Sequence, residues 1–200
     1  YPLKKFVKKV EFKSKINNSI IYHGNLGPER GISDLVNALS IVIKTIPDVK
    51  LSIYGGYRIS SYQNELLQLI SSLELNKSIT INGHLEHKDI WEHIRLHKVG
   101  VIPFKDNHLT RLNTPTKLFE YMACGCNIVS ASLEPIFRYD LRGANFFRPG
   151  DINDLAMSII KSLKKEDFDS LFYNQNKILN KYCWELNESK IKDIYKAILE

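Results

Sequence analysis

Short apolar runs alternate with segments of helical periodicity along most of this chain, and that alternation restricts the possible folds more than any other feature. The runs are expected to be strands at residues 19–23, 49–54, 78–81, 99–103 and 127–131, with a weaker strand at 145–147. Helical patterns lie at residues 31–46, 60–74, 87–96, 115–124, 151–164, 167–180 and 184–199. Strands and helices that alternate over short loops predict an α/β domain with a doubly wound, mainly parallel, Rossmann-like sheet.

The loops after the predicted strands are where a ligand site is expected. In a parallel α/β sheet, ligands bind beyond the carboxyl ends of the strands. Loops of unusual composition occur at four of these ends, residues 24–31, 55–58, 83–86 and 104–116. Their common position favours one functional edge of the sheet.

The helix after the last of these loops is the most informative segment. Thr114 is expected to be its N-cap and Pro115 its first residue, a position where proline is tolerated. Thr116, Lys117 and Glu120 would share one face, where the helix N-terminus and the lysine attract an anion. Glu120 could accept hydrogen bonds from ribose hydroxyls, so the segment outlines a nucleoside-diphosphate site. The alternative is an ordinary surface ion pair between Lys117 and Glu120.

The glycine-bearing loops supply further candidates, each with a structural alternative. The loop that starts at Gly24 leads to Arg30, which can bind phosphate oxygens unless it is an exposed side chain in a plain strand–helix turn. Gly55 indicates either close passage of the backbone against a ligand or a tight turn. The main chain of Gly83 and Leu85 could contact a nucleobase, or the glycine could serve the turn alone.

Composition argues against several other classes of protein. The formal net charge of +6, with a local lysine excess in the first fifteen residues, favours anionic partners but is most simply a solubilising surface. Zinc-finger spacing and aromatic RNA-binding signatures are absent from the sequence, so neither a metal nor nucleic acid is expected. The three cysteines, Cys124, Cys126 and Cys183, suggest a reducing compartment.

The sequence carries no signal peptide and no long apolar span, which predicts a cytoplasmic location, either free or peripheral at the inner face of the membrane. The chain begins at Tyr1 rather than at methionine. It is therefore expected to be a piece of a longer protein.

A series of motifs, taken in order along the chain, resembles the donor-binding half of the retaining GT-B glycosyltransferases, and more narrowly the large group 1 family, GT4. The resemblance runs from about residue 19 to the C-terminus. The motifs are Tyr22-x-Gly24-x-Leu26, Arg30-Gly31, Leu35-x-x-Ala38-Leu39, Leu51-x-Ile53-x-Gly55, Ile81-x-Gly83 and the most specific block, Pro115-Thr-Lys-Leu-Phe-Glu-Tyr-Met-Ala-Cys-Gly125.

The resemblance implies an enzyme of two Rossmann-like domains, of which this chain would be the C-terminal half that binds a UDP- or GDP-linked sugar. By position, Arg30 and Lys117 would contact the diphosphate and Glu120 would hold the ribose. Backbone groups of residues 114–116 would meet the phosphate or the sugar. The other implied donor-binding positions are Gly24, Asn25, Gly55, Gly83 and Leu85. Retaining members are thought to use the leaving phosphate as the base, and no metal or other cofactor is implied.

Two departures from the family pattern bear on the site. Many members carry an acidic residue that touches the transferred sugar, eight positions before the equivalent of Glu120, where this chain has Leu112. Many also have a basic residue after the first glycine, where this chain has Asn25. Recognition of the sugar is thus less specified than recognition of the nucleotide.

The resulting hypothesis divides the chain into a lead-in, residues 1–18, and a nucleotide-sugar-binding domain, residues 19–200. The helix at 182–200 would close the domain's own core, pack toward a missing N-terminal acceptor domain, or both. The parent enzyme would be a hexosyltransferase that builds a polysaccharide or glycolipid, with a membrane-associated acceptor as one option, and the fragment alone would be inactive. The alternatives are a non-catalytic nucleotide-binding module and a nucleotide-sugar epimerase of the same fold.

Overall fold

The computed structural model describes residues 1–8 and 14–199. Residues 9–13 of the predicted lead-in, with two of its lysines, Lys9 and Lys13, lie outside the described residues, as does Glu200.

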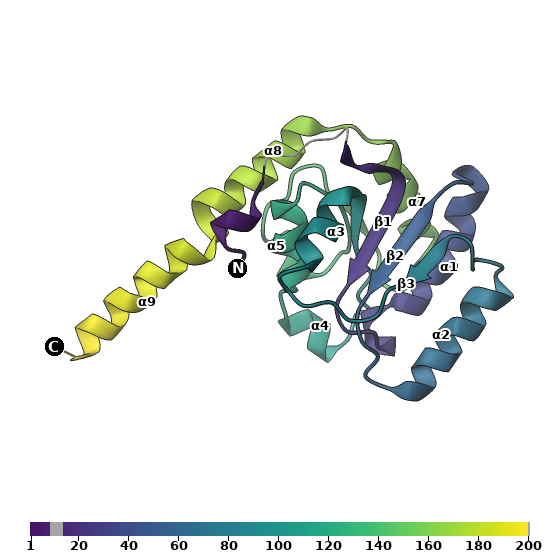
Figure 1. The fold of residues 1–200 in the computed structure, drawn as a ribbon, viewed down its shortest axis with the longest axis horizontal. Helices are drawn as coiled ribbons and strands as arrows, with labels where there is room; N and C mark the ends of the chain where they lie inside the picture. Colours follow the sequence, from purple (N-terminus) through teal and green to yellow (C-terminus); the bar gives the residue numbers. More distant parts are fainter. Residues whose placement is uncertain (9–13, 200) are drawn as a thin grey trace.

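A single parallel sheet of six strands forms the centre of the described chain, in the order β3-β2-β1-β4-β5-β6 (Figure 1). This arrangement confirms the predicted doubly wound α/β fold. The strands are β1 (Ile16–His23), β2 (Lys50–Tyr54), β3 (Ile79–Ile81), β4 (His97–Ile102), β5 (Asn127–Ala131) and β6 (Asn145–Phe147). β1 begins earlier than expected because its first residues, which are polar, still pair irregularly with β4.

Helices cover both faces of the sheet. The α-helices are α1 (Ile32–Thr45), α2 (Ser60–Ser72), α3 (Ile90–Leu96), α4 (His108–Leu112), α5 (Thr116–Ala123), α6 (Glu134–Phe137), α7 (Ile152–Lys164), α8 (Phe168–Lys177) and α9 (Trp184–Leu199). The shorter turns are η1 (Lys4–Phe6), η3 (Pro28–Arg30) and the π-helical η4 (Ile178–Tyr182). α1 packs against α7 and α2, whereas α5 packs against α3 and α8. None of the described helices is both long and apolar enough to cross a membrane.

Two short helices, α4 and α6, were not expected from the sequence. α4 lies inside the predicted loop at 104–116 and begins with a reciprocal cap: Asn107 Oδ1 accepts from the Thr110 N–H at 3.1 Å, and Thr110 Oγ1 accepts from the Asn107 N–H at 3.1 Å. A helix of one turn is too short to produce a hydrophobic period, which explains why it was missed. The predicted helix at 167–180 is also divided, into α8 and η4.

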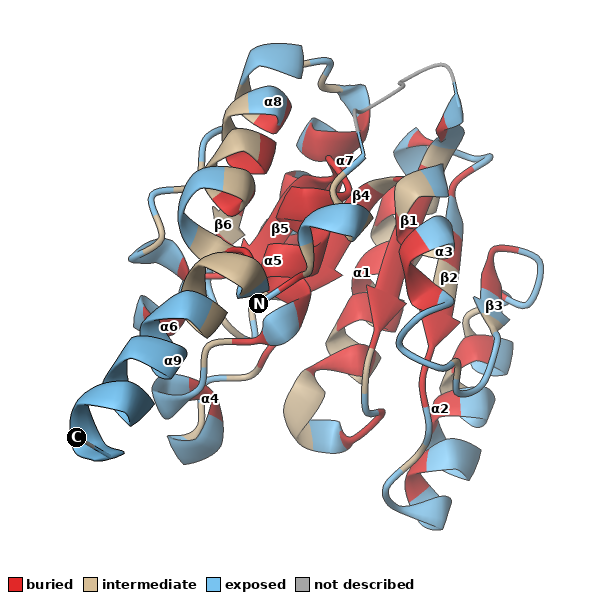
Figure 2. Cartoon of the chain, turned by 60° about the vertical axis from the view of Figure 1, so that its left-hand side comes forward, coloured by how far each residue is buried: buried red, intermediate tan, exposed pale blue. Residues whose placement is uncertain are grey.

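The core lies along β1, β4 and β5, whose side chains are almost all buried (Figure 2). Tyr121 of α5 is fully buried against Gly100 of β4, where a Cβ atom would lie 2.5 Å from its ring. The Tyr121 hydroxyl donates hydrogen bonds to the carbonyls of Ile21 (3.3 Å) and Val101 (3.4 Å). α5 is thereby held directly on the two central strands.

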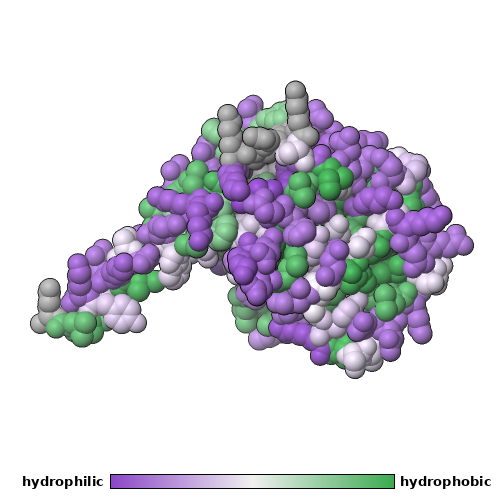
Figure 3. Space-filling view, viewed as in Figure 1, coloured by the Kyte–Doolittle hydropathy of each residue, from purple (hydrophilic) through white to green (hydrophobic). Residues whose placement is uncertain are grey.

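The last helix behaves differently from the others. α9 projects from the domain (Figure 1) and has no buried residue. Apolar atoms are visible along it in Figure 3, and Ile194, Tyr195 and Ile198 are exposed. The expectation that this helix closes the domain's own core is therefore wrong. Packing toward a missing domain stays a prediction.

The N-terminal residues lie against the start of α9. The Trp184 N–H donates to the Pro2 carbonyl at 2.8 Å, and the Lys4 N–H donates to the Glu185 carboxylate at 2.9 Å. Tyr1 stacks on Tyr182 with ring centroids 5.8 Å apart. The beginning of the chain is thus tied to the segment where α9 leaves the domain.

We expect Gly100→Ala to destabilise the domain, because the added methyl group would displace the Tyr121 ring that anchors α5. Overpacking of this kind costs about 1–3 kcal/mol. Urea denaturation should show the loss. Gly56→Ala is the matched control, since a Cβ at Gly56 meets nothing within 4 Å and its stability should stay within about 0.5 kcal/mol of the wild type. Equal stability of the two variants would contradict this account of the anchor.

Candidate functional site

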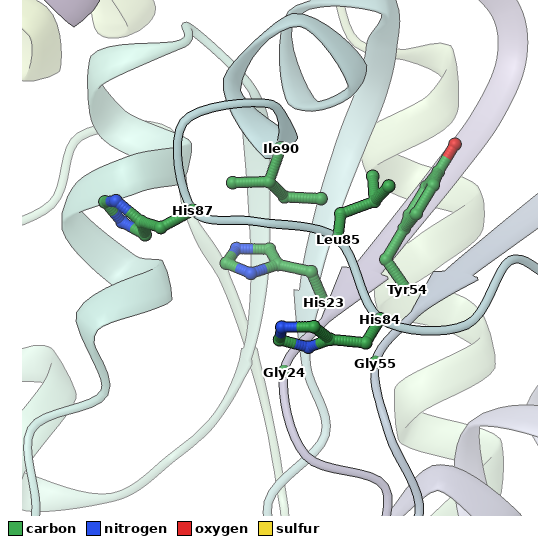
Figure 4. Close-up of a pocket in the computed structure, with 8 residues that line it drawn as sticks. All are labelled: His23, Gly24, Tyr54, Gly55, His84, Leu85, His87 and Ile90. Carbon is green, nitrogen blue, oxygen red and sulfur yellow. The ribbon is translucent and has the colours of Figure 1, made fainter.

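Three adjoining cavities, among those in the described part of the chain, lie around the carboxyl ends of β1, β2 and β3. The loop cavity, of about 170 Å³, is lined by His23, Gly24, Tyr54, Gly55, His84, Leu85, His87 and Ile90 (Figure 4). The carboxylate cavity, of about 270 Å³, is lined by Tyr1, Pro2, His87, Trp91, Thr116 and Glu120. The lysine cavity, of about 200 Å³, is lined by Gly24, Asn25, Arg30, Phe104, Asn113, Thr114, Pro115, Thr116 and Lys117. Each cavity shares a residue with each of the other two, so they form one continuous region.

The start of α5 differs from the sequence-based expectation. Pro115 has the extended backbone of the N-cap position, with ψ 131°, and the helix begins at Thr116. The Thr114 hydroxyl is directed elsewhere: it accepts from Arg138 Nη2 at 2.9 Å and donates to the Pro135 carbonyl at 3.2 Å. The prediction that Thr114 caps the helix is therefore wrong, because the residue before a proline is held extended and lies outside the first turn. With no side-chain cap, the first N–H groups of α5 remain available beside the lysine cavity.

Lys117 is buried at the wall of the lysine cavity. Its side chain lies beneath Gly24, where a Cβ atom would sit 3.2 Å from Lys117 Nζ. Nζ lies over two aromatic rings, 4.9 Å from the centroid of Tyr22 and 4.8 Å from that of Phe104. Within the described residues Nζ has neither a hydrogen bond nor an ion pair. Burial, together with the nearby charge of Arg30, lowers the pKa of Lys117 to about 7.

Arg30 approaches the same cavity from η3. Its guanidinium carbon lies 5.1 Å from the Phe104 ring centroid, and only 12% of its side chain is exposed. The exposed arginine of a plain turn is thus contradicted. Glu29 partly balances the charge, because its carboxylate lies 3.3 Å from Arg30 Nε. The structure therefore brings Arg30 and Lys117 together around one ring.

Three of the predicted glycines lie side by side at the sheet edge. The Gly55 N–H donates to the Gly83 carbonyl at 2.6 Å, and the Gly24 N–H donates to the Tyr54 carbonyl at 2.9 Å. Gly55 has a φ of 154°, and a Cβ there would overlap the Gly24 carbonyl. This position thus needs glycine because one backbone segment passes against another, a third explanation beside the two that the sequence left open.

Glu120 forms the centre of the carboxylate cavity and is only 4% exposed. Its Oε1 accepts a hydrogen bond at 2.9 Å from Nε2 of His87, on the loop after β3. Its Oε2 lies 3.0 Å from Nε2 of His23, at the end of β1, but that contact is off the axis of a good hydrogen bond. Both partners are buried or partly covered, so the alternative of a surface ion pair with Lys117 is contradicted.

The two histidines set the charge state of this cavity. Burial alone would raise the pKa of Glu120, but the contacts with His23 and His87 outweigh it and lower the pKa to about 2. The hydrogen bond to Glu120 raises the pKa of His87, while burial lowers that of His23. Glu120 is therefore an ionised carboxylate with acceptor capacity to spare.

Sequence reasoning missed His23, His87, Tyr22 and Phe104. His23 ends a predicted strand at the functional edge, and a polar residue at that point was the available signal. His87 follows the predicted loop at 83–86 and carried no comparable signal. The pairing of either one with Glu120 joins residues distant in sequence, which no local pattern reveals.

The remaining predicted positions line the region without forming its charged centre. Leu85 is half-buried at the loop cavity and packs against the core, and Gly83 is exposed. Asn25 is exposed at the lysine cavity, where its carbonyl accepts from the Tyr22 hydroxyl at 2.9 Å. Leu112, on α4, is 74% exposed.

The cysteines are not part of this region. Cys124, Cys126 and Cys183 are buried free thiols, and burial raises the pKa of both Cys124 and Cys126. Across the described residues, no group of three or more His, Cys, Asp or Glu side chains is arranged to hold a metal ion.

Comparison with known proteins identifies the family. The model described as glycosyl transferases group 1 matches residues 4–179, most of the chain. No curated protein sequence matches it.

Several solved structures share the fold at low sequence identity. Anabaena Alr3699/HepE, in complex with UDP and glucose, has a TM-score of 0.78 and 19% identity over 90% of this chain and 48% of its own. The pneumococcal O-GlcNAc transferase GtfA, in complex with UDP and GlcNAc, has a TM-score of 0.77 and 16% identity over 96% of this chain and 38% of its own. A mutant of S. aureus TarM, in complex with Fondaparinux, alpha-GlcNAc-glycerol and UDP, has a TM-score of 0.76 and 15% identity over 94% of this chain and 37% of its own. This chain thus spans about half, or less, of the proteins it matches.

We expect Lys117→Met to stabilise the ligand-free domain, because it removes a buried cation that has no anionic partner among the described residues. The gain should be about 1–4 kcal/mol at pH 6. The folded pKa, about 7, is lower than the ordinary value of 10.5, so the unfolded chain binds more protons between these values and wild-type stability rises with pH there. The advantage of the variant should therefore shrink from pH 7 upward.

Urea denaturation at pH 6, 7, 8 and 9 measures this difference. Lys44→Met, at an exposed position of α1, is the matched control and should follow the wild type at every pH. A constant difference between Lys117→Met and the wild type across the series would show that Lys117 is charged throughout.

Proposed function

The chain belongs to the glycosyl transferases group 1 family, and from that premise we propose that it is the nucleotide-sugar-binding domain of a retaining glycosyltransferase of the GT4 type. One observation carries the proposal: a buried ammonium, Lys117, and a buried carboxylate, Glu120, one turn apart on α5, face adjoining cavities at the carboxyl edge of the sheet. A nucleoside diphosphate presents the matching groups, an anion and a vicinal diol, at a similar spacing.

The diphosphate occupies the lysine cavity in this proposal. Lys117 and Arg30 supply positive charge there, and the uncapped N-terminus of α5 adds unpaired N–H groups. Negative charge grows on the diphosphate as its bond to the sugar breaks. Fixed cations in a partly dry cavity stabilise that charge in the transition state more than in the bound donor. These side chains therefore supply charge of the kind that some enzymes obtain from a metal ion.

The ribose and the base occupy the other two cavities. Glu120 is ionised and has lone pairs left for ribose hydroxyls in the carboxylate cavity. The base lies in the loop cavity, between Tyr54 and the segment Gly83–Leu85, whose main chain offers both donors and acceptors. UDP and GDP are the two candidate nucleotides, and UDP is the first probe because it is the nucleotide named for the similar structures.

For the whole protein, we propose that a preceding domain supplies the acceptor site and that the cleft between the two domains is the active site. The parent enzyme transfers a hexose with retention of configuration, in the cytoplasm or peripherally at the inner face of the membrane, to build a polysaccharide or glycolipid. Leu112 offers no carboxylate to the transferred sugar, so this domain selects the nucleotide more strictly than the sugar. A non-catalytic nucleotide-binding module is the second candidate for the chain by itself, since it spans about half or less of the similar structures.

The binding proposal predicts that this chain binds UDP or GDP with little transfer or hydrolysis of the nucleotide sugar. Lys117→Ala should weaken a nucleoside diphosphate at least tenfold and the monophosphate less, because the lysine meets the diphosphate. Glu120→Ala should weaken both to the same degree, because both carry the ribose. Titration calorimetry measures these affinities, with Lys44→Ala as a surface control. The site assignment fails when the wild type binds no nucleotide, or when neither variant changes the affinity.

Diphosphate binding should also be accompanied by proton uptake. The pKa of Lys117 is about 7 in the free domain, and an adjacent anion favours its charged form, so binding at pH 8 should take up close to one proton. The uptake should fall toward zero by pH 6, where Lys117 is already charged. Calorimetry in buffers of different ionisation enthalpy measures the number. In Lys117→Arg the guanidinium is always charged, so binding with undiminished uptake would contradict the assignment to Lys117.

A further inference from the structure

His87 links the loop cavity to the carboxylate cavity. It is the residue that lines both, and it stands on the segment at 82–89 that joins β3 to α3. Two-thirds of its side chain, 67%, is exposed, yet Nε2 reaches the buried Oε1 of Glu120 at 2.9 Å. The imidazole thus connects a surface loop to the carboxylate on α5 (Figure 4 shows its position relative to the loop cavity).

The orientation of the Glu120 carboxylate depends on this contact. Within the described residues, His87 provides the single well-aligned hydrogen bond to the carboxylate, because the approach of His23 to Oε2 is off-axis. The carboxylate has about four acceptor positions, and His87 occupies one of them. Fixing Oε1 in this way leaves the other lone pairs in a constant direction toward the cavity.

His87 is itself braced by aromatic rings. Its ring meets the edge of Trp91 at 5.5 Å and that of Phe6 at 6.5 Å between centroids. Phe6 and Trp91 are stacked at 4.5 Å with an interplanar angle of 1°, and Arg95 Nη2 donates to the Phe6 carbonyl at 2.8 Å. The imidazole is therefore held in place although most of its surface is open.

The proton on His87 has a defined position. An ionised carboxylate oxygen at 2.9 Å requires a donor, so Nε2 carries hydrogen whether or not Nδ1 does. The raised pKa of His87, caused by the same hydrogen bond, agrees with this assignment. A side chain that supplies one N–H at that point, such as glutamine, could replace it in part.

We propose that His87 is a positioning residue for ribose recognition: by holding Glu120 through Oε1, it aims the carboxylate at the ribose hydroxyls and ties that recognition to the loop that meets the base. The inference rests on the proposed nucleotide-binding function. It assigns His87 a specific effect, the preference for a ribonucleotide over its 2′-deoxy counterpart. A carboxylate that is free to turn would still attract a nucleotide but would discriminate less between one hydroxyl and two.

The test compares UDP with 2′-deoxy-UDP by titration calorimetry, or GDP with 2′-deoxy-GDP when GDP binds more tightly. The wild type should prefer the ribonucleotide by at least roughly tenfold, since hydrogen bonds to charged groups are strong. His87→Ala should reduce that preference by about fivefold or more. His87→Gln should restore most of it and also serves as the second variant when His87→Ala does not fold.

His84→Ala is the matched control, because His84 is a histidine of the same loop that lines the loop cavity and has no hydrogen bond to Glu120 among the described residues. It should change the two affinities by the same factor. Equal weakening of the two nucleotides by His87→Ala, or an equal loss in His87→Gln and His87→Ala, would overturn the positioning role while nucleotide binding stands. Absence of nucleotide binding by the wild type would overturn the proposed function together with this inference.

Discussion

The buried, unpaired ammonium of Lys117 is the constraint on which the rest of the site depends. A cation held out of water needs compensation, and here the described structure supplies only the faces of Tyr22 and Phe104, with a second cation, Arg30, nearby. The close contact with Gly24 keeps water away from one side. Such an arrangement is unfavourable until an anion enters, which makes the cavity a preorganised receptor for negative charge.

α5 carries this constraint because it is also part of the core. Every residue of the helix after Thr116 is buried. Tyr121 fixes the helix to β1 and β4 through two backbone carbonyls, and Lys117 and Glu120 project from the same turns toward the cavities. Functional and structural side chains therefore share one backbone. The site cannot shift without disturbing the packing of the sheet, which explains how a short helix can hold two buried ionised side chains in fixed directions.

The sequence predicted the fold and the charged residues of the site because both leave local patterns. Near-continuous apolar strands reveal a sheet covered on both faces, and Lys117 and Glu120 stand one turn apart in a recognisable block. Contacts between distant segments were not predictable. Glu120 meets His23 and His87 only after β1 and the loop after β3 come together, and Thr114 lost its expected role to a contact with Arg138, which directly follows α6. That contact depends on a helix too short to show a period.

The attachment of the N-terminal residues to α9 has a mechanical consequence. Tyr1 and Pro2 form part of the wall of the carboxylate cavity, and Pro2 is hydrogen-bonded to the first residue of α9. The projecting helix is therefore a lever whose fulcrum borders the cavity that contains Glu120. Anything that binds the apolar side of α9 and tilts it also moves that wall. By reciprocity, a ligand that holds the wall in place stiffens the lever against its partner.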